Sequence, residues 1–88
     1  MAVTYVDNTI VMTADNDALA LKCELIGMQL EHTAAANAII QDTAGHAIGT
    51  LRTTTSVLRD HQEWPKGIVV NGLVVETLSA GTVTFFLK

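Results

Sequence analysis

Apolar and polar residues alternate with a period of two along much of the chain, and this pattern limits the fold more than any other feature of the sequence. Successive side chains of a β-strand point to opposite faces, so the alternation predicts strands with one buried face. The composition agrees, because 12 Thr, 9 Val and 6 Ile stand among the 88 residues and β-branched side chains favour strands over helices. The sequence therefore predicts a chain built from strands.

The C-terminal third shows the alternation most clearly. Residues 82–87 form a final predicted strand after a turn at 79–81, with Phe86 on its outer face. Upstream, the pair Asn71 and Gly72 separates two apolar runs. Because both residues tolerate positive φ, this pair predicts a β-hairpin. The alternative is a bend within one edge strand.

The middle of the chain predicts a second hairpin. A turn of the form Asp-x-x-Gly at 42–45 lies between apolar runs at 38–41 and 46–53, and such turns join antiparallel strands. The alternative is a short helix over 33–42, which consecutive alanines favour locally. We predict the strands.

Residues 18–32 alternate as well, but their apolar phase reverses between Leu25 and Ile26. One extra residue in a strand produces such a reversal, so the pattern predicts a strand that contains a β-bulge. A helix is the alternative interpretation. Ahead of this segment we expect a short strand over 9–13 and a polar turn over 14–17.

Residues 53–67 lack a clear period, and Pro65 removes one backbone donor there, so we expect a long irregular loop at about 53–67. Short strands joined by tight turns are typical of sandwiches and barrels. We therefore predict an all-β fold, in which residues 1–88 form one domain. This domain is expected to be a small antiparallel β-sandwich or jelly-roll-like barrel of six to eight short strands.

A body this small needs support that the covalent chain does not supply. Small domains often depend on disulfides, metals or oligomerisation, and Cys23, expected as a small buried hydrophobe, is the only cysteine. Charged residues make up 16% of the chain, against roughly 25% in typical domains. We therefore expect neighbouring subunits to cover part of the apolar surface.

Charge and hydropathy argue against two classes of partner. The net charge is −4 and the five Lys and Arg residues are scattered, so we expect no nucleic-acid partner. The uncharged run at residues 67–75 is too short to span a bilayer, so we expect no membrane partner. Residues 1–6 lack the features of a signal peptide, and a protein made in the cytoplasm is expected.

No group of residues has the spacing of a metal motif. The three histidines, His32, His46 and His61, are not arranged in a zinc-binding pattern. Asp15 and Asp17 resemble part of a calcium loop, but the glycine and the glutamate that complete this loop are missing. A polar turn is the expected structure, and no metal and no cofactor are expected.

Catalysis is also not expected. Asp60, His61 and Glu63 lie in the predicted loop with Ser56, whereas a nucleophile needs a rigid position beside its base. The sequence therefore predicts no catalytic residues and no enzymatic activity.

Four residues are candidates for an interface: Trp64, Phe86, Tyr5 and Leu58. Aromatic and large aliphatic side chains anchor cores and subunit contacts more often than other functions. An exposed aromatic ring stacked on a sugar is the alternative.

The segment 67–82 reads G-I-V-V-N-G-L-V-V-E-T-L-S-A-G-T, and it follows the Asp-x-x-Gly turn and a variable loop. In this arrangement of turns and apolar positions, residues 36–88 resemble a group of small bacteriophage virion proteins. The resemblance implies a small β-barrel or jelly-roll fold and a role as a capsid cement or decoration protein, often trimeric, or as a tail or fibre component. It implies no catalytic residues. The alanine-rich stretch at 33–38 departs from the pattern.

These observations predict a structural protein of the virion. We expect a capsid cement or decoration subunit that stabilises the particle by homo-oligomeric contacts, with a trimer favoured. Its other expected partners are the major capsid protein or other virion proteins. The alternative is a receptor- or carbohydrate-binding module of a phage tail or fibre, with Trp64 as the exposed ring.

Overall fold

The computed structural model describes the backbone of residues 3–6 and 8–88, and the side chains from Asn8 onward. All regular secondary structure in this part of the chain is β-strand. The strands are β1 (Val3–Val6), β2 (Thr9–Met12), β3 (Ala18–Glu31), β4 (Ala36–Gln41), β5 (Ala47–Thr53), β6 (Arg59–Leu78) and β7 (Thr82–Leu87). They form one antiparallel sheet in the order β1-β2-β7-β3-β6-β4-β5. The all-β prediction is confirmed, and the helical alternatives are wrong. The described residues contain no helix long and apolar enough to cross a bilayer.

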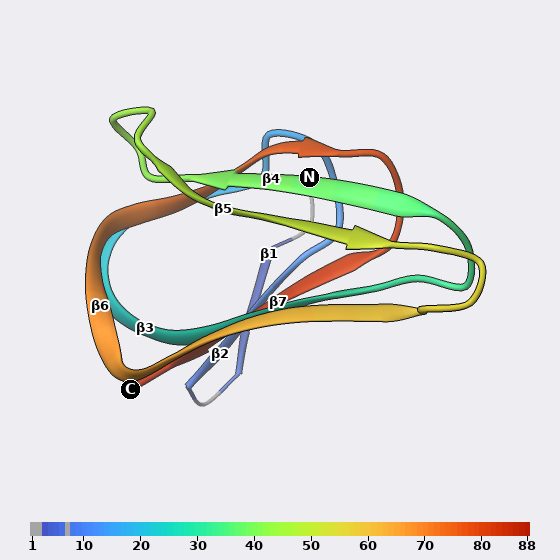
Figure 1. Cartoon of the computed structure of the whole chain (residues 1–88). Coiled ribbons are helices and arrows are strands. Elements are labelled where there is room, and N and C mark those ends of the chain that lie inside the picture. Colours follow the sequence, from blue (N-terminus) through green and yellow to red (C-terminus); the bar gives the residue numbers. More distant parts are fainter. Residues whose placement is uncertain (1–2, 7) are drawn as a thin grey trace.

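Two of the strands are much longer than the sequence predicts. β3 has 14 residues and β6 has 20, and the two pair along most of their length. Both strands curve sharply at the left of Figure 1. The last residues of β6, 74–78, pair with β4, whereas the second half of β3, residues 25–31, pairs with β7. The single sheet thereby folds over into two layers.

Irregular pairing at the centre of β3 produces part of this curvature. The register shifts between Leu25 and Gly27 in the pairing of β3 with both β6 and β7, which confirms the predicted bulge. In β6 the insertion is larger, because residues 64–67 stand opposite Ile26 alone. Gly67 closes the insertion with a φ of 77°, a conformation that glycine adopts without steric cost.

The pair Asn71 and Gly72 does not form a hairpin, and that prediction is wrong. The chain continues through both residues as β6: Asn71 pairs with Lys22 of β3, and Leu73, which follows Gly72, pairs with Leu19. A tight hairpin turn of the Asn-Gly type needs positive φ at both residues, and only Gly72 has it, at 94°. The alternative of a bend within one strand is correct, although this strand lies between β3 and β4 rather than at an edge.

The long loop expected at about 53–67 is also wrong, because β6 begins at Arg59 and only residues 54–58 are irregular. Thr54 holds this short loop: its N–H donates to the carbonyl of Val57 at 2.8 Å, and its hydroxyl accepts from the Val57 N–H at 3.0 Å. The first residues of β6 alternate between exposed and half-buried positions. The exposed residues among them are mostly polar or charged, which is also typical of loops.

The core lies between the two layers of the folded sheet. Cys23, expected to be buried, is half-buried against it, and this burial raises the pKa of its thiol. Asp17 and Thr53 are the buried polar residues in the described part of the chain. The buried apolar residues are Ile10, Met12, Leu25, Met28, Leu30, Ala36, Ala38, Ile40, Leu51, Val70, Leu73, Val75, Leu78, Val83 and Phe85.

Candidate functional site

An aromatic ring lies on the outer face of the sheet at Phe86. Its neighbour Phe85 is fully buried, so strand alternation turns Phe86 outward. Phe86 pairs with Gly27 of β3, and a Cβ added to Gly27 would lie 3.6 Å from Cδ2 of the ring. The ring therefore covers the glycine, yet 38% of Phe86 remains exposed.

Two hollows with apolar walls lie beside this ring. One, of about 370 Å³, is lined by Ile26, Pro65 and Phe86 together with Gly27 and Glu63. The adjoining hollow, of about 330 Å³, is lined by residues 64–68 and shares Pro65 with the first. Below, the Phe86 surface means the four side chains Ile26, Trp64, Pro65 and Phe86.

The structure brings together two of the four predicted interface residues. Trp64 is half-buried, packs against the core and lines the hollow next to that of Phe86. Leu58 is 45% exposed but lies at the other end of β7, in a hollow that includes Thr82. The side chain of Tyr5 lies outside the described residues, and its backbone pairs with Ile10.

Other exposed apolar side chains were not singled out from the sequence. Leu21, Val57 and Val69 are 56%, 53% and 64% exposed. A signal for Val69 was present, because consecutive apolar residues in a strand point to opposite faces, and Val70 is buried. Leu21 falls at the register shift between Leu19 and Lys22, which no local pattern reveals.

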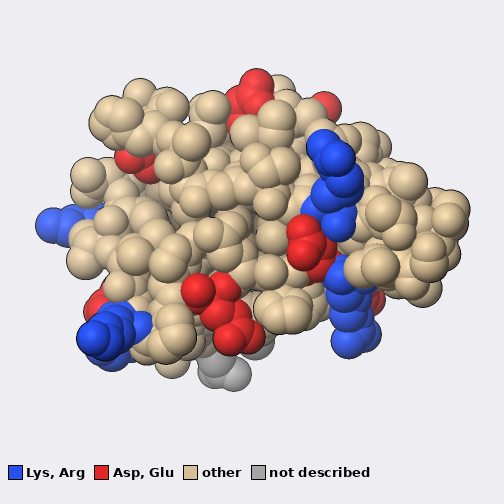
Figure 2. All heavy atoms as spheres, viewed as in Figure 1, with Lys and Arg blue, Asp and Glu red and all other residues tan. Residues whose placement is uncertain are grey.

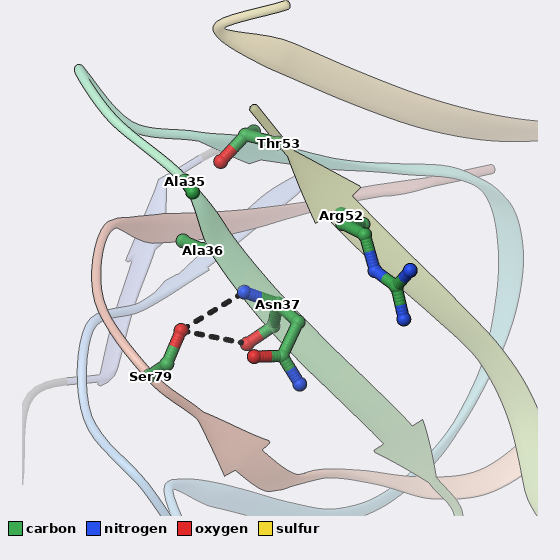
Figure 3. Close-up of a pocket in the computed structure, with 6 residues that line it drawn as sticks. All are labelled: Ala35, Ala36, Asn37, Arg52, Thr53 and Ser79. Atoms are coloured by element: carbon green, nitrogen blue, oxygen red, sulfur yellow. Dashed lines mark hydrogen bonds between the residues drawn. The ribbon is translucent and has the colours of Figure 1, made fainter. Parts of the chain in front are cut away.

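A polar hollow of about 370 Å³ lies where β4 begins and β6 ends (Figure 3). Its hydrogen bonds hold backbone segments together. The N–H of Asn37 donates to the hydroxyl of Ser79 at 2.9 Å, and the hydroxyl of Thr53 donates to the carbonyl of Ala34 at 2.8 Å. Arg52, the cross-strand partner of Asn37, lies beside them. The Ser79 and Thr53 hydroxyls thus support the fold at this junction.

The acidic residues considered for chemistry also contact the backbone. Asp60 Oδ2 accepts a hydrogen bond from the N–H of Arg52 at 2.9 Å, and Asp17 Oδ2 accepts from the N–H groups of Thr13 and Ala14 at 3.1 Å. The latter bonds confirm the polar turn predicted at 14–17. Within the described residues, no group of three or more His, Cys, Asp or Glu side chains is placed to hold a metal ion.

Charged side chains are interspersed on the face shown in Figure 2, where acidic and basic groups lie close together and most of the surface carries no charge. Two ion pairs also join opposite charges: Arg59 Nε lies 2.8 Å from Glu31 Oε2, and Lys88 Nζ lies 3.5 Å from Glu24 Oε1. This face therefore presents no field of a single sign to a partner.

No protein family model, no curated protein and no solved structure matches this chain. The site is accordingly defined by its geometry: an exposed aromatic ring on a small sheet, with apolar hollows beside it. Such a surface suits contact with another apolar surface.

Proposed function

We propose that the chain is a structural subunit of a bacteriophage particle, a capsid cement or decoration protein. It acts by packing against copies of itself, with a trimer favoured, and against the major capsid protein or other virion proteins. The observation that carries this proposal is the Phe86 surface, since exposed aromatic side chains next to pockets are frequent anchors of protein interfaces.

The low charge content supports the same conclusion. Only 16% of the residues are charged and 49% are hydrophobic, so polar groups cover the small body incompletely. Contact with neighbouring subunits would remove the exposed part of Phe86 from water, which stabilises the assembly by roughly 25 cal/mol for each Å² of apolar area buried. The resemblance of residues 36–88 to small phage virion proteins supports the placement in a particle.

Light scattering coupled to size-exclusion chromatography tests the proposal at micromolar concentration. We expect a mass near three times that of the 9.4 kDa chain. A stable monomer would contradict a preassembled trimer. Mass spectrometry of phage particles purified from the host that carries the gene should then detect the chain, and its absence from intact particles would contradict the virion location.

One observation favours a second candidate function, a carbohydrate-binding module of a phage tail or fibre. The side chain of Trp64 lines an apolar hollow with Pro65 and Lys66, and aromatic rings can stack on the apolar faces of sugars. This function predicts glycan-array binding that Trp64→Ala abolishes and that Leu58→Ala, at the far end of β7, leaves unchanged. No bound glycan, or equal loss in both variants, would contradict it.

A further inference from the structure

The β5 strand ends the sheet order, so one of its long edges has no strand partner in the described part of the chain. Unpaired backbone groups on such an edge are a template for the strand of another molecule. Natural proteins often protect edges with lysines or proline, but β5 contains neither, and Arg52 is its one charged residue. Its protection must therefore come from elsewhere in the fold.

The carboxylate of Asp60 occupies this edge. The N–H of Arg52 donates to Asp60 Oδ2 at 2.9 Å, so this N–H points away from β4. Backbone groups of alternate residues in a strand face the same side, and those of Thr50 therefore face outward as well. Asp60 thus holds one of the N–H groups that an added strand would need.

The geometry of the 54–58 loop explains why a side chain, rather than a neighbouring strand, binds the edge of β5. β5 and β6 leave the loop in different layers (Figure 1), and Asp60, near the start of β6, reaches the β5 backbone with its side chain. Farther along, a Cβ added to Gly49 would lie 2.6 Å from Gln62 Oε1. Asp60 and Gln62, alternate residues of β6, therefore both lie against β5.

We infer that Asp60 guards the free edge of β5 and blocks strand addition by a second copy of this chain. The second copy is the matching partner because an antiparallel pair of β5 strands centred on Thr50 places each Arg52 opposite Ile48. No like charges then face each other, and cross-strand pairs without like charges are tolerated. The added pairing joins β5 edges and leaves the Phe86 surface free.

Hydrogen exchange followed by NMR tests whether Asp60 holds the Arg52 N–H. In the unmodified chain we expect this amide to be protected from exchange. Asp60→Ala should speed its exchange about tenfold or more, since a hydrogen bond to a charged group is lost. The same variant should form a species with twice the mass of the unmodified assembly at high concentration. Glu76→Ala, which removes the same charge from an exposed position of the same strand, should show neither change.

Two further variants separate edge protection from a general loss of folding. Asp60→Asn keeps an acceptor oxygen and should keep the unmodified mass. Asp60→Ala combined with Thr50→Pro removes an outward N–H from the edge, and should lose the doubled species. An unprotected Arg52 amide in the unmodified chain would overturn the inference, and so would a doubled species that survives Thr50→Pro.

Discussion

The carboxylate of Asp17 accepts a hydrogen bond from the backbone N–H of Thr13, four residues earlier, at 3.1 Å. Asp17 is fully buried, and its own carbonyl accepts from the N–H of Val75 at 2.9 Å. Because Val75 belongs to β6, the turn that leads from β2 into β3 is fastened to the central pair of long strands.

Replacing Asp17 by alanine should therefore destabilise the fold. The variant leaves the N–H groups of Thr13 and Ala14 without this acceptor, at a cost of about 2 kcal/mol or more in the free energy of unfolding. Urea denaturation measures the change. Glu76→Ala is the control, because the exposed Glu76 accepts from the adjacent Thr77 hydroxyl and should cost less than about 0.5 kcal/mol. Equal effects of the two substitutions would refute the proposed role of the turn.

Gly72→Ala should be more costly than Gly45→Ala, although both glycines have a φ near 90° (94° and 90°). At Gly45 an added Cβ meets no atom within 4 Å, so backbone strain of about 1–2 kcal/mol is the whole expected effect. At Gly72 it would lie 2.5 Å from Cγ2 of Thr43 and 2.7 Å from the carbonyl oxygen of Leu19. The backbone there must move, which adds about 1 kcal/mol or more. Similar thermal unfolding of both variants would contradict the close approach.

Phe86→Ser should weaken self-association without unfolding the protein. Phe86 lies on the outer face, whereas core packing is provided by Phe85. Loss of an aromatic anchor typically costs about 2 kcal/mol of binding, which raises the dissociation constant more than tenfold. Sedimentation velocity measures this change. Val57→Ser, at a position that is 53% exposed in the 54–58 loop, should leave the mass unchanged, and the opposite ranking would place the interface elsewhere.

Acid should weaken the β4–β5 hairpin through Asp42. The N–H of His46 donates to Asp42 Oδ1 at 2.9 Å, and this bond is the main reason that the pKa of Asp42 is lowered. Such a group stabilises the fold above its unfolded pKa, about 3.9, and this contribution is lost as the pH falls through the lower folded pKa. Between about pH 5 and pH 3, the unmodified chain should therefore lose more stability in urea than Asp42→Asn does. Parallel losses would show that the turn does not depend on the ionised carboxylate.

Local sequence patterns were sufficient for most of the fold. The phase reversal at Leu25 and Ile26 marks the bulge, and the Asp42 turn marks the hairpin, because both signals are contained in a few adjacent residues. The sequence pattern wrongly predicted that β6 is interrupted, because Pro65 and Gly72 usually end a short strand. Here the long partner β3 supplies hydrogen bonds on both sides of these interruptions, and no local pattern reports such a partner.

Part of the candidate site was likewise predictable from local patterns, and part depends on tertiary contacts. Alternation along β7 was enough to place Phe86 on the outer face. Its proximity to Trp64 depends on the insertion of residues 64–67 opposite Ile26, which is a matter of register between strands distant in sequence. The roles of Asp60 and Asp17 as backbone acceptors likewise follow from tertiary contacts.

The pairing of β3 with β6 has a consequence for how quickly the chain reaches this structure. The β4–β5 hairpin lies between these strands in the sequence, so it can form early from neighbouring residues, within about 1–10 μs. The long strands meet first near Glu31 and Arg59 and last near Ala18 and Val74, with ever larger chain segments enclosed. Folding becomes slower as contacts become more distant in sequence. The completed pairing of β3 with β6 should therefore set the refolding rate, on the millisecond-to-second scale typical of such topologies.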